Sequence, residues 1–346
     1  MLNWKLLNKI IGSLLMIEAT LMLVCSIMSL CYGESDTLPF ISSTAITAAG
    51  GVACRLVGRG ADNNLRRKEA YFLVTATWVI FSFFGMFPFL IGGYTANVTD
   101  AFFETISGFT TTGASIIDDV EVLPHAILFW RSMTQWIGGL GIVFFTIALL
   151  PSLVGSGSVK VFSAETTGPI HTKMHPRLST SAHFIWMIYI ILTLVCALCY
   201  YIGGMSAFDC INYSMTTLAT GGFATHNSST EFFNSPFIEY TATLFCFLAG
   251  INFLLLYATI IKRQIGDFFR NSEIRLYIGA IVACTAIVMY YLMSKNGYDF
   301  WNALRFGQFQ VVSFIASTGV FSDDARQWPH VTWIVLGVWM FIGGCA

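Results

Sequence analysis

The sequence contains three stretches that share one pattern, and this pattern decides the fold. They are FFETISGFTTTGAS at 102–115, FDCINYSMTTLATGGFATH at 208–226 and FWNALRFGQFQVVSFIASTGVFSDD at 300–324. In each stretch an apolar run of roughly 10 to 15 residues leads to Thr or Ser and then to Gly, and a run of that length is too short to cross a bilayer. The pattern is typical of a re-entrant segment, which enters the membrane and returns to the side it came from.

The three loop glycines indicate an internal repeat. Gly113, Gly222 and Gly319 are about 100 residues apart, which is the spacing expected for whole supersecondary units rather than for chance turns. Long apolar stretches precede and follow each loop. The repeated unit is therefore expected to be a membrane helix, a short re-entrant helix, a Gly-centred loop and a second membrane helix.

The composition agrees with a membrane protein. Hydrophobic residues make up 55% of the chain, charged residues make up 11%, and the mean hydropathy is +0.69. A soluble domain usually carries about 25% charged residues, so this chain has too few to cover a surface that faces water. The net charge of -1 and the absence of a long basic run in the sequence argue against a nucleic-acid partner.

Seven stretches approach the length of about 20 mainly apolar residues that a membrane helix needs, and an eighth begins near Val331. The seven are 10–31, 38–54, 71–93, 123–150, 183–204, 237–261 and 276–294. The stretch at 38–54 is the shortest, and it contains Gly50 and Gly51. Together with the repeated loops, these stretches predict an all-α polytopic membrane protein.

The distribution of charge predicts the orientation. Lys and Arg collect in every second connection, and acidic residues collect in the others. Cytoplasmic connections of membrane proteins carry the excess of Lys and Arg. We therefore expect the N-terminus and the connections 55–70, 151–182 and 262–275 to be cytoplasmic. Four basic residues depart from the pattern: Arg131, Lys295, Arg305 and Arg326.

The loops themselves have the chemistry of a cation filter. Backbone that is not helical survives at membrane depth only where it is buried in protein or lines a wet cavity. Backbone carbonyls can replace the water shell of a cation, and the C-terminal end of a short helix adds partial negative charge. Gly reaches positive φ without strain, and a Thr or Ser before it can add a hydroxyl oxygen. The predicted filter residues are Thr111, Thr112, Gly113, Thr220, Gly221, Gly222, Ser317, Thr318 and Gly319.

Five motifs in combination resemble a known group of transporters. They are ISGFTTTGAS at 106–115, QWIGGLGI at 135–142, TLATGGFATHN at 217–227, AGINF at 249–253 and FIASTGVFSDD at 314–324. The chain resembles the superfamily of bacterial Trk and Ktr and plant HKT potassium transporters, and most of all the bacterial Trk membrane subunit. The resemblance covers essentially the whole chain, including two extra N-terminal helices that are typical of the Trk branch.

The resemblance implies a fold similar to that of potassium channels, in which four M1–pore-loop–M2 repeats surround one pore. The implied organisation is two N-terminal helices at 1–60, then repeat 1 at 61–155, repeat 2 at 156–265 and repeat 3 at 266–346. The chain stops within the second helix of the third repeat, so the fourth repeat is expected to be missing. We expect this chain alone not to conduct, because three loops supply three sides of a four-sided filter.

The function implied by the resemblance is potassium uptake across the cell inner membrane, with K⁺ as the transported ion and no covalently bound cofactor. The implied K⁺ ligands are the backbone carbonyls of Thr111, Thr112, Thr220, Gly221, Ser317 and Thr318. Gly113 favours potassium, since a Ser at that position accompanies sodium in some plant members. Membrane lipid, a second copy of the chain in a homodimer and a cytoplasmic nucleotide-binding regulatory ring are the implied partners.

Three further residues are candidates for the gate or the pore lining. The family places a Gly- and Ser-rich intramembrane gate where this chain reads FIGGCA, which implicates Gly343 and Gly344. Asn252 lies in the middle of a predicted membrane helix after the second loop. It either makes a hydrogen bond between helices or lines the pore below the filter.

Two other classes of function compete with this hypothesis. The alternative is a secondary transporter coupled to Na⁺ or H⁺, which would use broken helices. Such carriers often bury carboxylates within membrane helices, whereas the acidic residues here lie mostly in the predicted outer connections. An enzyme is not expected, because the sequence contains no H-E-x-x-H, no G-x-S-x-G and no pair of intramembrane aspartates.

Several single residues have more than one interpretation. Arg131 lies inside a predicted membrane helix, where a buried charge is costly, and we expect it to pair with a pore-helix carboxylate such as Glu104. Glu18 lies outside the repeats and is expected to be a packing or interfacial residue. Cys196 and Cys199 form a C-x-x-C within an apolar run, where helix packing is the better interpretation. His171 and His175 offer too few ligands for a metal site.

Overall fold

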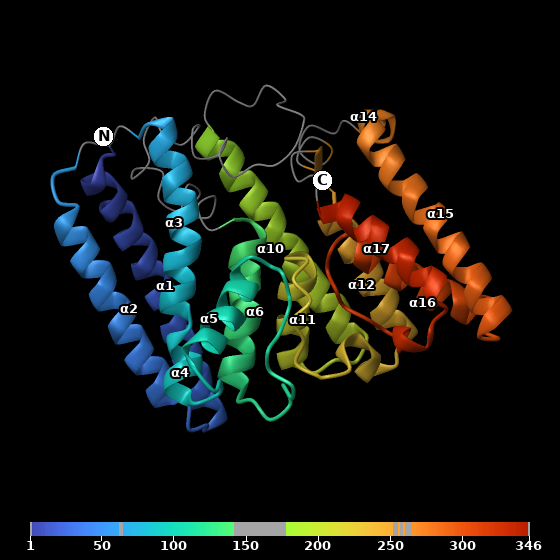
Figure 1. Cartoon of the computed structure of the whole chain (residues 1–346), viewed down its shortest axis with the longest axis horizontal. Helices are drawn as coiled ribbons and strands as arrows, with labels where there is room; N and C mark the ends of the chain where they lie inside the picture. The colour runs from blue at the N-terminus through green and yellow to red at the C-terminus, as the bar shows by residue number, and fades with distance from the viewer. Residues whose placement is uncertain are drawn as a thin grey trace. The chain divides into compact units, whose positions relative to one another are not determined.

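The structure is a computed structural model, and it describes residues 2–61, 65–141, 178–251, 255–256, 259 and 265–344. Within these residues the backbone forms helices joined by turns and loops, with no strand (Figure 1). The chain divides into two compact units, Met1–Trp186 and Met187–Ala346. The first unit holds the N-terminal helices and the first pore loop, and the second unit holds the other two pore loops.

The first unit contains six helices among its described residues, apart from the start of α10. They are α1 (Trp4–Tyr32), α2 (Thr37–Val57), α3 (Arg67–Gly85), α4 (Phe87–Gly92), α5 (Val98–Phe109) and α6 (His125–Gly139). The boundary between the units falls inside α10 (Leu178–Ile202). The remaining elements of the second unit are α11 (Ala207–Leu218), η2 (Ser229–Phe233), α12 (Pro236–Ala249), α14 (Ile265–Arg270), α15 (Ser272–Lys295), α16 (Phe300–Ile315), η3 (Ala325–Gln327) and α17 (His330–Gly344).

Five helical segments of the described chain are long and apolar enough to cross a membrane. They are Trp4–Tyr32, Thr37–Val57, Lys68–Gly92, Phe184–Ile202 and Ser272–Lys295. Two shorter apolar helices, Pro236–Ala249 and His330–Gly343, accompany them. The prediction of an all-α polytopic protein is confirmed, and the segment expected at 38–54 is a full helix of 21 residues.

Three predicted spans contain a break in the helix. The span predicted at 71–93 is confirmed in its extent as Lys68–Gly92, whereas the other two contain helix ends that the sequence did not predict. The helix expected at 71–93 is broken at Met86, two residues before Pro88, because proline cannot donate the backbone hydrogen bond of a helix interior. The helix expected at 123–150 ends at Gly139, and Gly141 has a φ of +77° that an α-helix does not allow. The helix expected at 237–261 ends at Ala249, with Gly250 as its C-cap.

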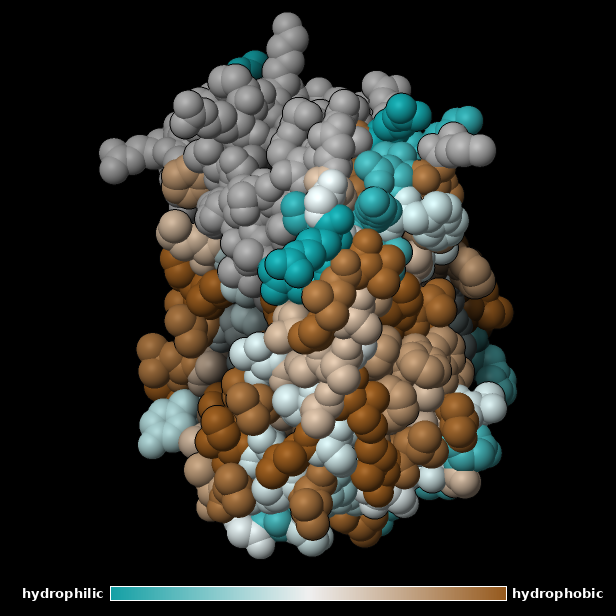
Figure 2. All heavy atoms as spheres, turned by 90° about the vertical axis from the view of Figure 1, so that its left-hand side faces the viewer, coloured by the Kyte–Doolittle hydropathy of each residue, from teal (hydrophilic) through white to brown (hydrophobic). Residues whose placement is uncertain are grey.

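The N-terminal helices form a tightly packed antiparallel pair. A Cβ on Gly12 would lie 2.6 Å from the carbonyl oxygen of Gly51 and 2.7 Å from the backbone nitrogen of Arg55, so the two backbones touch where the glycines face each other. Small residues permit such close approach in membrane helices. Figure 2 shows that the face presented by this unit is hydrophobic over most of its height, with hydrophilic residues gathered towards the upper end.

Within the first unit, the basic segments lie together at one end. The backbone at Gly58 lies against Lys5 and Lys9, and the backbone N–H of Asn3 donates to Glu69 Oε1 at 2.9 Å. The basic N-terminus and the basic connection after α2 therefore share one end of the unit. Glu34 and His125 meet at the other end, where Glu34 Oε1 lies 2.7 Å from His125 Nδ1.

Candidate functional site: the three pore loops

Each pore loop follows a short helix that begins with a side-chain cap. Asn97 accepts a hydrogen bond from the Asp100 N–H at 2.9 Å, and Ser206 accepts one from the Asp209 N–H at 3.0 Å. Asp299 occupies the same position before α16. Since α5 and α11 have 12 residues each, they are about 18 Å long and cannot cross a hydrocarbon core of about 30 Å. The prediction of re-entrant half-helices is therefore consistent with their length.

The three short helices end in the same turn. The first filter residue of each loop has a left-handed backbone, with φ of +55° at Thr111, +51° at Thr220 and +56° at Ser317. The next residue donates its N–H to a carbonyl five positions earlier: Thr112 to Ser107 at 2.9 Å, Gly221 to Thr216 at 2.9 Å, and Thr318 to Ser313 at 2.8 Å. This is the C-terminal hydrogen bond of a Schellman motif.

A left-handed Thr is strained, since a β-branched residue with positive φ is an outlier. Such strain persists only where the surroundings impose it, and it clusters at functional sites. The sequence did not signal this feature, because Gly is the residue normally expected at such a turn. Its occurrence at Thr111, Thr220 and Ser317 makes the turn a shared feature of all three loops rather than a local accident.

The predicted role of the loop glycines in reaching positive φ is confirmed. Gly113, Gly222 and Gly319 have φ of +73°, +79° and +78°. In each triplet the first and third residues therefore have positive φ, and the same backbone conformation recurs three times. Coordination of K⁺ by the carbonyls of these triplets stays a prediction.

The second and third loops lie side by side. A Cβ added to Gly222 would collide with the carbonyl oxygen of Thr318, whereas a Cβ on Gly319 would meet no atom within 4 Å. Gly222 is therefore needed both for its backbone conformation and for the contact between two filter segments. Ser317 Oγ, one residue before Thr318, is buried without a hydrogen-bond partner among the described residues. A buried hydroxyl oxygen without a partner is costly, and a cation is one group that would satisfy it.

In two of the loops a serine of the short helix supports the segment directly after the filter glycine. We call this segment the filter strand, although it belongs to no sheet. Ser107 Oγ donates to the carbonyl oxygen of Ala114 at 2.6 Å, and Ser313 Oγ donates to that of Val320 at 2.7 Å. The corresponding residue of the second loop, Thr216, donates instead to Tyr213 in its own helix at 3.2 Å. The second loop therefore lacks this particular support.

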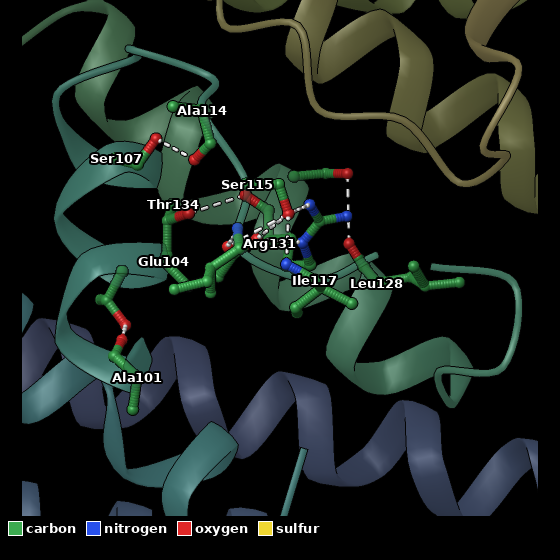
Figure 3. Close-up of polar contacts among 12 residues, drawn as sticks. Ala101, Glu104, Ser107, Ala114, Ser115, Ile117, Leu128, Arg131 and Thr134 are labelled. Carbon is green, nitrogen blue, oxygen red and sulfur yellow. Dashed lines mark hydrogen bonds and ion pairs between the residues drawn. The ribbon is translucent and has the colours of Figure 1, made fainter. Parts of the chain in front are cut away.

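Behind the first loop lies the ion pair that the sequence predicted. Arg131 Nε of α6 donates to Glu104 Oε1 of α5 at 2.8 Å, and the two side chains are 2% and 0% exposed (Figure 3). Ser115 Oγ lies 3.1 Å from Glu104 Oε1, and Arg131 Nη2 donates to the same hydroxyl at 3.1 Å. The strand that leaves the filter is thus tied to both helices.

A second ion pair joins the second and third repeats, and the sequence analysis missed it. Arg305 of α16 donates from Nε and Nη2 to the two carboxylate oxygens of Glu239 in α12, each at 2.5 Å. The side chains are 13% and 2% exposed. The available signal was Arg305 itself, one of the basic residues that depart from the segregation of charge. Its partner lies 66 residues away in another repeat, so spacing gave no link.

The three gate candidates have different outcomes. Gly343 lies in α17, where an added Cβ would collide with the carbonyl oxygen of Ile315 at the end of α16. Gly138 makes the same close contact with Phe109 in the first repeat. Gly344 ends α17, and Asn252 lies outside the described residues. A gating role for these residues stays a prediction.

Acidic groups lie just beyond the second and third loops. Thr225 Oγ1 donates to Asp209 Oδ1 at 2.6 Å, and Tyr298 Oη donates to Asp323 Oδ2 at 2.8 Å. Burial, followed by the hydrogen bond to Asp323, raises the pKa of Tyr298 to about 12. Carboxylates near the entrance of a cleft raise the local concentration of cations.

Comparisons with known proteins agree with this geometry. The chain is 34% identical to the Trk system potassium uptake protein TrkH of Salmonella typhimurium over 348 residues, which cover 100% of this chain and 72% of that protein. It is 31% identical to the Trk system potassium uptake protein TrkG of Escherichia coli, covering 99% of this chain and 70% of that protein.

A solved structure also matches. The crystal structure of the potassium transporter TrkH from Vibrio parahaemolyticus has a TM-score of 0.84 at 30% identity, and the match covers 98% of this chain and 70% of that chain. The family profile TrkH, described as a cation transport protein, matches residues 40–346. A match of this extent, together with relatives that are similar along the whole chain, leads to one conclusion: this chain belongs to the TrkH family of cation transport proteins.

Proposed function

We propose that this chain forms part of the membrane subunit of a Trk-type system, which takes up potassium across a cell inner membrane. The observation that carries the proposal is the recurrence of one filter backbone in three loops, with positive φ at Thr111, Thr220 and Ser317 and again at each following glycine. The relatives named as Trk system potassium uptake proteins support potassium as the transported ion.

The proposed mechanism follows from the short helices and the loops. The C-terminal ends of α5, α11 and α16 place partial negative charge next to the filter residues, which favours a cation over an anion. Carbonyls of the filter residues replace the water shell of potassium, and selectivity depends on the number and arrangement of these ligands. Ser317 Oγ, buried and without a partner among the described residues, would supply a further oxygen.

The alternative of a carrier coupled to Na⁺ or H⁺ is less well supported. Coupled carriers use buried carboxylates that bind and release a cation or a proton. Among the described residues of the repeats, the buried carboxylates Glu104 and Glu239 each form an ion pair with an arginine, and the buried Glu69 accepts hydrogen bonds from two backbone N–H groups. Glu18 is fully buried without a partner in the described chain, but it belongs to α1, outside the repeats.

The proposed assembly includes partners that the Trk system implies. A second copy of the chain would complete a homodimer, and a cytoplasmic nucleotide-binding ring would regulate the pore. The N-terminus and the basic connections would be cytoplasmic. Cysteines placed at Lys68 and at Asp118, on a background without other cysteines, test this orientation. An impermeant thiol reagent added outside should label position 118 and not position 68, and the reverse pattern would contradict the orientation.

Ion flux tests the proposal directly. The protein is expressed in cells deficient in potassium uptake, and rubidium uptake is measured against sodium competition at matched membrane levels. Rubidium uptake that excess sodium does not suppress is the expected result. Gly113→Ser should weaken discrimination against sodium, because the added Cβ and hydroxyl disturb the carbonyl geometry at a residue with a φ of +73°. Unchanged selectivity in this variant would contradict the assignment of Gly113 to the selectivity filter.

A further inference from the structure

We infer that Glu104 and Arg131 are positioning residues that set the ion selectivity of the first filter loop, and that they do so as an ion pair whose two charges cancel. The inference rests on the proposed function and concerns the same filter. It assigns a role to two charged residues that the sequence analysis singled out only as a structural pair.

The contacts of Glu104 connect three segments of the first repeat. Its carboxylate accepts hydrogen bonds from Arg131 Nε of α6 at 2.8 Å and from the backbone N–H of Ile116 at 3.0 Å. Ser115 Oγ donates to either carboxylate oxygen, at 3.1 Å and 3.2 Å. One side chain of α5 therefore fixes both α6 and the strand that leaves the filter.

The strand held in this way begins directly after the filter. Ser115 is two residues beyond Gly113, and its hydroxyl also accepts a hydrogen bond from Arg131 Nη2 at 3.1 Å (Figure 3). The Ile117 N–H donates to the same hydroxyl at 3.2 Å. Since Gly113 is followed so closely by an anchored residue, a shift of the anchor changes the direction of the filter carbonyls.

The charges of the pair have a second consequence. Glu104 and Arg131 are 1% and 2% exposed, so water does not screen them well. Loss of the carboxylate alone leaves a buried positive charge near a cation site, whereas loss of the guanidinium leaves a negative charge there. The two losses therefore have opposite electrostatic effects on a cation in the filter, although both release the strand.

The arrangement is specific to the first repeat among the described residues. Glu104 lies nine positions before Gly113, and the residues nine positions before Gly222 and Gly319 are Tyr213 and Gln310. Tyr213 Oη donates to the carbonyl oxygen of Ser229 at 3.0 Å, and this bond holds a segment beyond the second filter. Among the described residues, a carboxylate that is paired with an arginine and binds the residue two positions after the filter glycine is thus a property of the first loop.

The test compares five variants of the protein. For each variant we measure rubidium uptake, the competition of sodium with that uptake, and the melting temperature in detergent with K⁺ or Na⁺. Glu104→Gln should lower rubidium selectivity over sodium about tenfold and raise the half-saturating rubidium concentration, because an unpaired cation repels the ion. Arg131→Gln should lower selectivity by a similar factor without raising that concentration. Arg131→Lys keeps the charge and should recover part of the selectivity.

Ser115→Ala tests the inference in case the variants of the ion pair do not fold. It keeps the ion pair and removes only the hydroxyl link to the filter strand, so it should fold and should lower selectivity about threefold. Glu69→Gln is the matched control: Glu69 is 2% exposed and accepts hydrogen bonds from the backbone N–H groups of Asn3 and Arg66, far along the chain from the filter. It should lower the melting temperature and leave selectivity unchanged.

The outcomes separate this inference from the proposed function. If the parent protein shows neither rubidium uptake nor a melting temperature that depends on K⁺, the proposed function fails and the inference falls with it. If the parent protein is selective and both Glu104→Gln and Ser115→Ala retain its selectivity, the pair is structural only and the inference is wrong. Equal half-saturation in Glu104→Gln and Arg131→Gln would refute the role of charge.

Discussion

The loop around Gly113 and the loops around Gly222 and Gly319 share one backbone conformation but are held by different contacts. The first loop is supported within its own repeat, where Glu104 and Arg131 lie behind the filter strand. The second and third loops are supported by each other, through the close approach at Gly222 and through the ion pair of Glu239 and Arg305.

This difference shows that a repeated backbone does not require a repeated set of supports. The shared turn is encoded locally, by the end of a short helix and a glycine two residues after its first left-handed residue. Apart from the serines Ser107 and Ser313, which two of the repeats share, the supports described above come from residues that differ between the repeats. A substitution in one loop is therefore not a guide to the same substitution in another, and the following predictions test this.

The largest effect is expected for Gly222→Ala. The added Cβ would collide with the carbonyl oxygen of Thr318, and the alanine would have to adopt a φ of +79°. Gly319→Ala is the matched control, since it has a φ of +78° but meets no atom within 4 Å, so it should cost only the conformational strain of about 1–2 kcal/mol. Rubidium uptake at matched membrane levels should be abolished by the first and reduced by the second. Equal loss in both would mean that packing between the two loops is unimportant.

The next largest effect is expected for Glu239→Gln, which leaves Arg305 without its bidentate partner. Removal of one member of a buried ion pair typically costs about 3 kcal/mol or more. The melting temperature of the purified protein should fall, while Glu231→Gln, at an exposed residue of η2, should leave it unchanged. The double variant Glu239→Gln with Arg305→Met should recover part of the loss, because no unpaired charge remains. Additive losses in the double variant would show that the two residues are not coupled.

A smaller effect is expected for the serines behind the filters. Ser107→Ala and Ser313→Ala each remove a hydrogen bond to a carbonyl directly after the filter glycine, at a cost of about 1 kcal/mol. Both should lower selectivity modestly. Thr216→Val loses only a bond to Tyr213 in its own helix, so its ion selectivity should equal that of the parent protein. A selectivity change in Thr216→Val as large as in the serine variants would contradict the conclusion that the second loop lacks this hydrogen-bond support.

The smallest effect is expected for Asp36→Asn in the first unit, which tests a buried carboxyl group that has no arginine. Burial raises the pKa of Asp36, while its hydrogen bond with Ser29 lowers it and the nearby Glu34 raises it. A raised folded pKa means that stability is greatest below the ordinary value and is lost as pH rises through the folded value. At pH 7 the variant should therefore melt at an equal or higher temperature, with a flatter dependence on pH above 4. A clear drop in melting temperature at pH 7 would contradict this sign.

Much of the fold and part of the site could be predicted from the sequence. Hydropathy identified the helices because the bilayer sets their length, and the three Gly-centred loops followed from apolar runs that were too short to span. The pairing of Arg131 with Glu104 was predicted because a charge at that depth needs a partner in the same repeat. These inferences depend on local sequence and on one physical constraint each.

The features that sequence reasoning missed depend on contacts between distant segments. The pair of Glu239 and Arg305 joins two repeats, and nothing in the spacing of the residues indicates which charges meet. The described helices α6 and α12 end at Gly139 and Ala249, inside apolar stretches that the sequence analysis treated as single spans. The glycines there were the only signal, and glycine is tolerated inside many membrane helices.

The contacts of Gly138 and Gly343 restrict how two of the helices can move. Neither position has room for a methyl group next to the last carbonyl of the helix that precedes the loop, which is Phe109 of α5 in one case and Ile315 of α16 in the other. An axial rotation of α6 or α17 would push that carbonyl, so each helix and its short neighbour must move as a rigid body.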